Sequence, residues 1–268
     1  MTALESTRKM QKIILDINEI LIEYGINFNL TLEDVTITEN GIYVLSSSKF
    51  YGIVEEYVYP SISEAYVYHF TTKEASKNIE KTEKFRMYSI LKRYGEGEIK
   101  PLLKKLNFNM LFDDTDNLKD KNSYKHTFYA SFISADETGQ QSDTEKYFRS
   151  LTDVRLKFKI KSTKGYFRKI NYMSNNKIEF LEKLHNLIKE KYNRVLMLDG
   201  ILSRFPTFTI SDEYSIEDEY RIYWKVFDNG YNPFKIKIDE DNNEYIELSL
   251  DKNNFTGITL SLKEIEKC

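Results

Sequence analysis

The sequence is poor in the residues that build disulfides, metal sites and flexible linkers. Its 268 residues include one cysteine, three histidines, four prolines and ten glycines. Because the single cysteine, Cys268, is the last residue, an internal disulfide and a Cys-rich zinc site are both excluded. The histidines at positions 69, 126 and 185 match no His-Glu-x-x-His spacing, so we expect no bound metal.

Signatures of several protein classes are also missing. No apolar run approaches the roughly 20 residues that cross a bilayer, so we expect a soluble, cytoplasmic protein with no membrane partner. No Walker motif, dinucleotide-binding glycine fingerprint or Gly-x-Ser-x-Gly elbow occurs, which disfavours kinase, Rossmann oxidoreductase and serine hydrolase functions. The acidic stretch at 113–117 lacks the turn glycine and closing glutamate of a calcium loop.

Aromatic residues are abundant instead. The chain has 20 tyrosines and 17 phenylalanines, an aromatic share of 14%, which favours strands over helix bundles. Apolar spacing predicts helices at 5–24, at 73–106 with a break at 95–97, and at 178–196. Alternation and turn signals predict strands at 28–37, 41–45, 51–59, 65–70, 127–134, 154–161, 215–227, 234–238, 245–250 and 257–262.

The order of these elements predicts an α+β chain in which strands dominate. Pro60 separates two of the predicted strands and marks a candidate boundary. We therefore expect residues 1–60 to form an N-terminal helix and β extension on a main domain of residues 61–268.

Charge is unevenly distributed along the chain, although the formal net charge is only −3. Residues 154–178 contain eight lysines or arginines and no acidic residue. In the strand at 154–161, alternation places Arg155, Lys157 and Lys159 together on one outward face. Such a face can contact phosphates, or it can be a sheet edge on which lysines prevent aggregation.

The segment at 215–224 combines acidic, basic and aromatic residues. If it is a strand, its period of two places Glu217, Glu219 and Arg221 on one face. Two neighbouring carboxylates disfavour joint ionisation unless a cation or a polar substrate lies between them, so this segment is a candidate active site. The alternative is a solvated strand face on which Arg221 pairs with a carboxylate.

Three strand segments carry polar residues among apolar neighbours, and their order resembles the ADP-ribosyltransferase fold, including the bacterial toxins that modify nucleic acid. They are Tyr68-His69-Phe70-Thr71, Tyr129-Ala130-Ser131-Phe132-Ile133-Ser134 and Glu217-x-Glu219-Tyr220-Arg221. Residues 66–260 also resemble the bacterial domain-of-unknown-function family numbered 2971. That likeness adds Val154-Arg155-Leu156-Lys157-Phe158, Tyr245-Ile246-Glu247-Leu248 and Gly257-Ile258. The Asn-Asp-Pro-x-Glu turn of the second family is replaced here by Gly95-Glu96-Gly97-Glu98, so no ligand contact is transferred from that loop.

The resemblance implies an ADP-ribosyltransferase-like fold, which is a split, mostly antiparallel β-sheet core with flanking helices. It implies NAD as co-substrate. Glu219 would stabilise the positive charge that develops on the ribose as nicotinamide leaves, and Glu217 would orient or deprotonate the acceptor. Cofactor binding would involve His69, Thr71, Arg86, Tyr88, Ser131 and Ser134.

The same resemblance implies that the acceptor contacts the loop before the glutamates, which carries Phe205, Phe208 and Tyr214. Aromatic side chains beside the basic face at Arg155, Lys157 and Lys159 favour single-stranded RNA or DNA. The leading hypothesis is therefore an NAD-dependent ADP-ribosyltransferase toxin acting on nucleic acid, in a toxin–antitoxin or phage-defence system with an antitoxin protein as partner. The alternatives are a non-catalytic nucleic-acid or protein-binding module on the same fold, and an NAD glycohydrolase.

Each of these residues also has a purely structural interpretation. A lone histidine such as His69 is often a hydrogen-bonded core residue, and serines such as Ser131 and Ser134 are common in strands. The remaining side chains fit core packing at Phe205, Phe208 and Tyr214, a helix surface at Arg86 and Tyr88, and ordinary packing at His126, His185 and Trp224.

Overall fold

The structure is a computed structural model, which describes residues 3–37, 41–44, 49–94, 99–115, 117–119, 124–135, 148, 151–198, 204–226, 233–252 and 257–268. The chain is of mixed α+β class, as expected. It divides into two compact units, each assembled from separate stretches of sequence. Unit 1 comprises Met1–Tyr59, Ile99–Asp120 and Asn171–Ile210, and unit 2 comprises Pro60–Glu98, Lys121–Ile170 and Ser211–Cys268.

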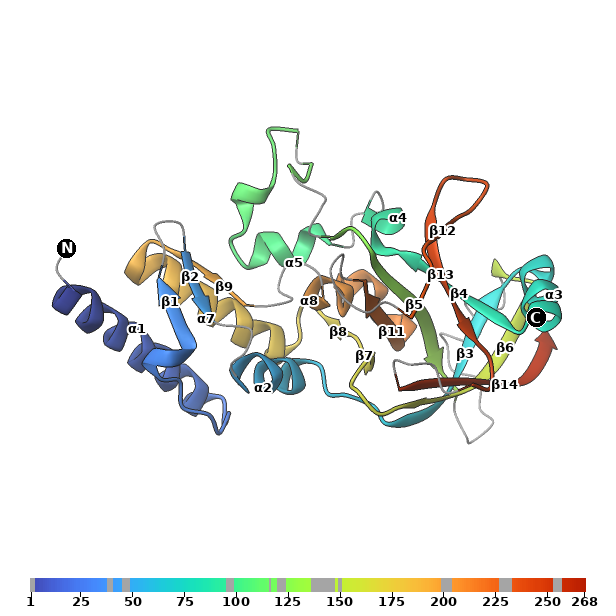
Figure 1. Cartoon of the computed structure of the whole chain (residues 1–268), viewed down its shortest axis with the longest axis horizontal. Helices are drawn as coiled ribbons and strands as arrows, with labels where there is room; N and C mark the ends of the chain where they lie inside the picture. The colour runs from blue at the N-terminus through green and yellow to red at the C-terminus, as the bar shows by residue number, and fades with distance from the viewer. Residues whose placement is uncertain are drawn as a thin grey trace. The chain divides into compact units, whose positions relative to one another are not determined.

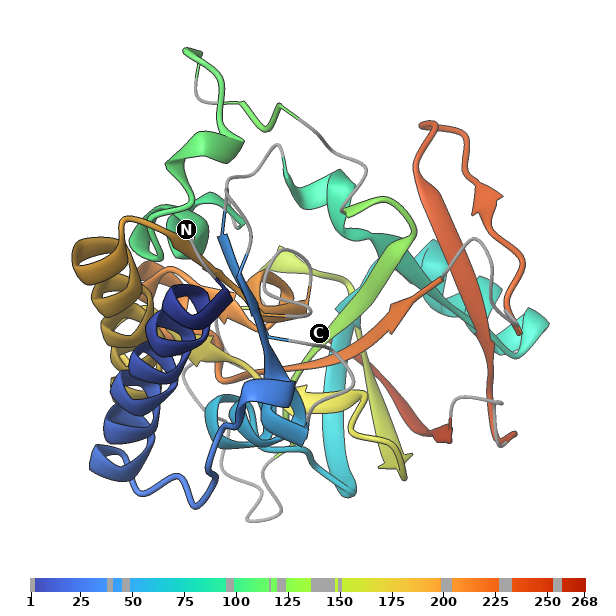
Figure 2. The same cartoon turned by 60° about the vertical axis from the view of Figure 1, so that its left-hand side comes forward.

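Unit 1 is built around two long helices, α1 (Ala3–Glu23) and α7 (Asn176–Tyr192), which lie side by side in Figures 1 and 2. Both are amphipathic, and on α1 the fully buried residues Ile13, Ile17 and Leu21 recur every four positions. The shorter elements are η1 (Leu32–Asp34), α2 (Lys49–Val58), α5 (Lys100–Lys105), η2 (Asn109–Leu111) and α8 (Arg204–Thr207). Two small sheets complete unit 1, one of β1 (Val35–Ile37), β2 (Gly41–Val44) and β9 (Val195–Met197), the other of β8 (Asn171–Tyr172) and β10 (Thr209–Ile210).

Two strand predictions in unit 1 were wrong. Residues 51–58 of the strand predicted at 51–59 belong to helix α2. Phe50, Val54 and Val58 are fully buried there at a spacing of four, so helical periodicity prevails over the β propensity of the valines and tyrosines. Residues 28–34 are not a strand, because the 3-10 turn η1 begins after Thr31, whose backbone N–H donates to the Asp34 carboxylate at 2.9 Å.

Unit 2 contains a curled, antiparallel nine-stranded sheet. The main path runs β12-β13-β4-β5-β3-β6-β14, and β11 pairs with both β5 and β7. The described residues of unit 2 also form helices α3 (Lys73–Thr82) and α4 (Ile90–Tyr94) and the 3-10 turn η4 (Asp212–Glu217). The strands are β3 (Glu64–Thr71), β4 (Lys84–Ser89), β5 (Thr127–Ser134), β6 (Val154–Ser162), β7 (Phe167–Lys169), β11 (Glu219–Lys225), β12 (Lys237–Ile238), β13 (Glu244–Ser249) and β14 (Ile258–Lys267).

Strand β5 is the point at which the sheet divides. β11 runs along one edge of β5 from Thr127 to Ile133. The other edge is shared, because β4 pairs with Phe128 and Tyr129 whereas β3 pairs with Ile133 and Ser134. The sheet is thus mostly antiparallel and forks at β5.

The two faces of this sheet differ in character because side chains alternate along each strand. One face, the core face, carries the hydrophobic core, including Val67, Phe85, Phe132, Leu156 and Phe158. We call the opposite face the tyrosine face. It carries Tyr66 and Tyr68 of β3, Tyr129 and Ser131 of β5, Arg155, Lys157 and Lys159 of β6, and Glu219 and Arg221 of β11.

The alternation predicted for 154–161 is confirmed, since Val154, Leu156, Phe158 and Ile160 all belong to the core. The sheet-edge interpretation of that strand was wrong, because β6 lies between β3 and β14.

Other boundaries also differ from expectation. The predicted helix at 73–106 is split into α3, strand β4, α4 and α5, and its predicted break at Gly95–Gly97 lies outside the described residues. Residues 1–60 are not an independent extension, because they share a compact unit with Ile99–Asp120 and Asn171–Ile210. Among the described helices, none combines the length and the apolarity needed to cross a membrane.

Candidate functional site

The candidate carboxylate Glu219 forms an ion pair with Arg221. The Arg221 Nε donates to one carboxylate oxygen at 2.7 Å, and its Nη2 donates to the other at 3.0 Å. The two side chains meet because they are two positions apart on β11 and therefore point to the same face. The guanidinium also lies over the Tyr129 ring, 4.7 Å from its centre.

Both members of this pair are almost completely buried, with 2% of Glu219 and 1% of Arg221 exposed. A buried carboxylate requires a partner of this kind, because an isolated charge in a protein interior is very unfavourable. The prediction that Glu219 and Arg221 share a face is therefore confirmed, and so is the alternative in which Arg221 pairs with a carboxylate. The solvated face proposed with it is wrong, because water is excluded from the pair.

Glu217 does not join this pair as a strand neighbour. It is the last residue of η4, and Asp218, which follows it, adopts a left-handed conformation with φ of 40°. The strand begins only at Glu219, so the alternation that was to align Glu217 with Glu219 does not extend that far. The predicted strand 215–227 is therefore confirmed from Glu219 to Lys225, whereas its first part, with Glu217 as a strand neighbour of Glu219, was wrong.

His69 lies on the other face of the sheet from Glu219. Ile133 pairs with both Tyr68 and Glu219, so these three residues share the tyrosine face, and His69, next to Tyr68, points the opposite way. The His69 ring packs edge-on against Phe85, with centres 5.0 Å apart, and its Nδ1 is 3.0 Å from the Ser131 carbonyl oxygen. Contacts of this kind are those of a hydrogen-bonded core histidine.

The other predicted cofactor residues are also divided between the two faces. Thr71 and Ser134 point toward the core face, because they alternate with Phe70 and Ile133. Ser131 lies opposite Arg221 on the tyrosine face, and its buried Oγ has no hydrogen-bond partner among the described residues. The expected single cleft containing His69, Thr71, Ser131, Ser134 and the two glutamates is therefore not what this sheet forms.

Arg86 and Tyr88 are strand residues, so the helix-surface interpretation was wrong. Both belong to β4, where Tyr88 pairs with Tyr129 of β5 and with Tyr245 of β13. The Arg86 guanidinium lies 4.5 Å from the centre of the Tyr245 ring. They extend the tyrosine face rather than approach His69.

The predicted acceptor-binding aromatics are divided between the two units. Phe205 and Phe208 belong to unit 1, where both are fully buried and pack against Tyr59, so the core interpretation of these two is confirmed. Tyr214 belongs to η4 of unit 2 and is 39% exposed, so the core interpretation of this residue was wrong.

The basic residues of β6 lie over tyrosine rings of β3. Arg155 is 4.2 Å from the centre of the Tyr68 ring, and Lys159 is 5.3 Å from that of Tyr66. Lys157 lies between them, 5.8 Å from Tyr66 and 5.9 Å from Tyr68. Sequence analysis found the cations but missed these tyrosines, although the alternation in Tyr66-Val67-Tyr68 was a visible signal.

Two of these three cations also contact carboxylates. Arg155 binds Glu266 of β14, and Lys159 binds Glu64 at 2.5 Å. The hydrogen bond from Lys159 lowers the pKa of Glu64, and the same bond raises the pKa of Lys159, so both remain charged at neutral pH. Lys157, in contrast, forms no ion pair with any described residue.

Within the described ranges, no group of three or more His, Cys, Asp or Glu side chains is arranged to hold a metal ion. One carboxylate oxygen of Asp113 accepts hydrogen bonds from the backbone amides of Thr115 and Asn117, which lower the pKa of Asp113 and close the loop on itself. Asp116 of the same loop lies outside the described residues.

Comparison with known proteins gives no family assignment, since no family model, no curated protein and no solved structure matches the chain. The resemblances drawn from short motifs therefore stay predictions.

Proposed function

We propose that unit 2 binds single-stranded nucleic acid on its tyrosine face. The observation that carries this proposal is the row of cations on β6 lying 4.2 to 5.9 Å from the tyrosine rings of β3. Nonspecific single-strand binding combines aromatic rings, on which bases stack, with basic side chains that follow the phosphates. This is the binding-module alternative of the sequence analysis.

The solvent exposure of these cations and tyrosines decides where a nucleic-acid strand would bind. Tyr68 is 7% exposed and Arg155 is 8% exposed, so both are buried beneath the surface that a ligand would contact. Tyr66, Lys157 and Lys159 are only partly buried, and Lys157 has no carboxylate partner within the described residues. We therefore assign base stacking to Tyr66 and phosphate contact to Lys157, with Lys159 exchanging Glu64 for a phosphate.

Binding of fluorescently labelled single-stranded RNA and DNA, followed by anisotropy at several salt concentrations, tests the proposal. Tyr66→Ala is expected to weaken binding roughly 5- to 100-fold, which corresponds to the loss of one stacked base. Lys157→Ala is expected to weaken binding of all sequences alike and to lower the salt slope by about one. Lys77→Ala, on the exposed surface of α3, is the matched control and is expected to change nothing. Salt-independent binding, or equal losses in the control, would remove the proposal.

The second candidate is the NAD-dependent transfer of ADP-ribose to the bound strand. It is favoured by Glu219, whose carboxylate accepts two hydrogen bonds from Arg221, and by Ser131, which lies opposite Arg221 on the same tyrosine face and whose Oγ has no hydrogen-bond partner among the described residues. An oriented anion stabilises a ribosyl cation as nicotinamide departs. The fork at β5 further supports the split sheet that the motif resemblance implies. His69 has no role in this second candidate function, because it lies on the opposite face of the sheet from Glu219.

Labelled NAD incubated with RNA, DNA or cell protein tests this second candidate. Transfer of label that Glu219→Gln abolishes is the expected outcome, whereas transfer that survives Glu219→Gln would exclude the mechanism. Release of nicotinamide without a labelled acceptor would indicate an NAD glycohydrolase. In the toxin setting, expression of the wild-type chain is expected to arrest growth and the Glu219→Gln variant to relieve the arrest.

A further inference from the structure

A pocket of about 330 Å³ opens on unit 2 where the segment at 233–237 meets strands β4 and β13. We call it the lysine pocket. The residues that line it include Lys84 of β4, Phe234, Lys235 and Lys237 of the segment, and Glu247 and Ser249 of β13. All of them belong to unit 2, so the pocket is a feature of that unit by itself.

Strand register brings basic side chains to this place. Between β4 and β13, Lys84 pairs with Ser249 and Arg86 pairs with Glu247. Residues two positions apart on a strand point to the same face, so these four side chains lie together. Lys237 reaches them from β12, the next strand of the sheet, and its Nζ is 2.6 Å from a Glu247 carboxylate oxygen. Cations from two strands therefore flank a single carboxylate.

Positive charge is in excess within the lysine pocket. Three ammonium groups line it against the one carboxylate of Glu247. The hydrogen bond to Glu247 raises the pKa of Lys237, and the like charge of Arg86 opposes that rise. Among the described residues, Lys84 and Lys235 contact no carboxylate, and the Lys84 Nζ donates instead to the Ser249 hydroxyl at 2.9 Å.

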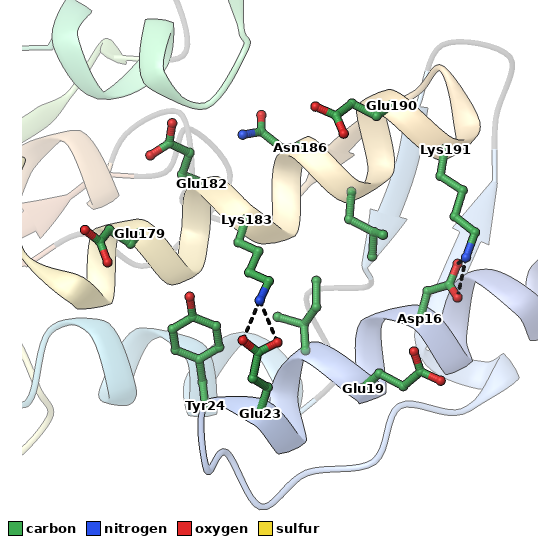
Figure 3. A pocket seen from close by; sticks show the side chains of 12 residues that line it. Asp16, Glu19, Glu23, Tyr24, Glu179, Glu182, Lys183, Asn186, Glu190 and Lys191 are labelled. Atoms are coloured by element: carbon green, nitrogen blue, oxygen red, sulfur yellow. Dashed lines mark hydrogen bonds and ion pairs between the residues drawn. The ribbon is translucent and has the colours of Figure 1, made fainter.

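The lysines in a second hollow of the protein, between α1 and α7, are all paired. Lys183 binds Glu23 and Lys191 binds Asp16 across the two helices, as Figure 3 shows. In the lysine pocket, two of the three ammonium groups have no such countercharge within the described part of the chain. Like charges held together disfavour one another, and an anion between them removes that cost.

We propose that the lysine pocket binds the phosphate or diphosphate group of a small ligand. Lys84 and Lys235 donate hydrogen bonds to the phosphate oxygens, whose negative charge balances the excess of cations. Lys237 exchanges Glu247 for the phosphate, since the Lys237 side chain is 41% exposed and water reaches the ion pair. A concave surface lined by charges of one sign also concentrates ions of the opposite sign.

The walls of the lysine pocket favour a small ligand over a nucleic-acid strand. Its volume of about 330 Å³ is near the lower limit for small-molecule sites, which is roughly 300 Å³. Phe234, the aromatic residue of its wall, is only 9% exposed and packs against Trp224, so it offers little surface on which a base could stack. Tyr66 and Lys157, which carry the nucleic-acid proposal, do not line the pocket, so the two proposals stand independently.

Isothermal titration calorimetry of the full chain with inorganic pyrophosphate at low salt tests the proposal. Binding is expected, with a change in the fluorescence of Trp224, the only tryptophan, whose ring centre is 5.6 Å from that of Phe234. Lys84→Ala/Lys235→Ala is expected to weaken binding at least tenfold, because two direct phosphate contacts are lost. Glu247→Gln is expected to tighten binding several-fold, because it removes the anion that competes for Lys237.

Two further variants serve as controls. Lys77→Ala/Lys189→Ala removes two exposed lysines, one of α3 and one of α7, and is expected to bind pyrophosphate as the wild type does. Lys84→Arg/Lys235→Arg keeps both charges and is expected to retain binding. Circular dichroism of each variant checks that the sheet remains folded.

Three outcomes would overturn the proposal. One is the absence of pyrophosphate binding, and another is an equal loss in the Lys77→Ala/Lys189→Ala control, which would mean a general attraction of anions. The third is that Lys84→Ala/Lys235→Ala weakens the binding of single-stranded RNA as much as that of pyrophosphate. The pocket would then belong to the surface that binds the strand and not to a small ligand.

Discussion

Glu219 and Arg221 differ from the other ion pairs described for this protein in the amount of water around them. Lys159 and Glu64 keep 24% and 41% of their side chains exposed, so solvent can replace either partner. Water cannot replace a partner of Glu219 or Arg221, because only 3% and 1% of these two side chains are exposed. The exposed ion pair of Lys159 and Glu64 therefore contributes little to the stability of unit 2. The buried pair of Glu219 and Arg221 is indispensable, because each charge needs the other as its partner.

We predict that Arg221→Met destabilises unit 2 by about 3–5 kcal/mol, because it leaves a buried carboxylate without a partner. The double variant Glu219→Leu/Arg221→Met is expected to recover most of that loss, since neither charge then remains. Urea unfolding followed by the fluorescence of Trp224 measures both, because this is the only tryptophan in the chain and belongs to unit 2. A double variant no more stable than Arg221→Met would contradict this account.

His185 of α7 is predicted to make folding sensitive to mild acid. Burial lowers the pKa of His185 from 6.5 to about 4, and its Nδ1 lies 2.7 Å from the Leu181 carbonyl oxygen. Because the folded-state pKa is lowered, the unfolded chain takes up the proton first. Stability is therefore complete above the unfolded value near 6.5 and is lost as the pH falls from there toward 4.

The expected loss across this range is about 3 kcal/mol, from 1.36 kcal/mol per pH unit. Urea unfolding followed by circular dichroism at pH 7 and pH 4 measures it. His185→Gln removes the titrating group and is expected to lose about 3 kcal/mol less stability than the wild type between these pH values. Parallel losses in the two proteins would assign the acid sensitivity to carboxylates instead.

At the scale of elements, local sequence specifies where α3 begins, but it does not show which element follows the helix. The side chain of Thr72 accepts a hydrogen bond from the Ala75 amide at 3.1 Å and so begins α3, a signal that the sequence carries by itself. The helix ends at Glu83, which adopts the left-handed conformation with φ of 52°. Strand β4 begins at the next residue, Lys84. Sequence analysis missed this strand because it lies between two helices, α3 and α4, and the whole stretch has a helical pattern of residues.

Glu83→Gly is expected to stabilise unit 2 by about 0.5–1 kcal/mol, because glycine adopts the left-handed conformation without the steric cost of a side chain. Lys81→Gly, two residues earlier in α3, is the matched control and is expected to destabilise by a similar amount. Urea midpoints from Trp224 fluorescence compare the two. A loss of stability in Glu83→Gly would show that the Glu83 side chain contributes more than its backbone strain costs.

At the scale of the whole molecule, each unit is assembled from stretches that are far apart in the sequence. The chain passes between the units after Tyr59, Glu98, Asp120, Ile170 and Ile210. Neither unit can therefore be obtained as one continuous piece of the sequence.

A truncation to residues 61–268 is consequently expected to lose the fold of unit 1. It removes α1 and α2, which pack against α7, together with Tyr24 and Tyr57, whose rings contact Phe180 of α7. Hydrogen exchange is expected to show unprotected amides in α7 and retained protection in the strands of unit 2. Protection of α7 equal to that in the full chain would support the independent extension predicted from the sequence.

The sequence by itself determined the features that depend on local periodicity and composition. The α1 and α7 helices, the alternation of β6 and the shared face of Glu219 and Arg221 all follow from spacings within one segment. The α+β class follows from the same patterns, and so does the absence of zinc-type cysteine clusters.

Only the tertiary structure decided which segments meet. The register of β3 and β11 on β5 placed His69 and Glu219 on opposite faces, a difference that one residue of register reverses and that no local pattern reports. Likewise, long-range packing joined residues 1–59 to 171–210, and it set Lys157 over Tyr66 and Tyr68. Side-chain alternation is a property of one strand, whereas pairing is a property of two, and this is why the candidate site was predictable in its residues but not in its assembly.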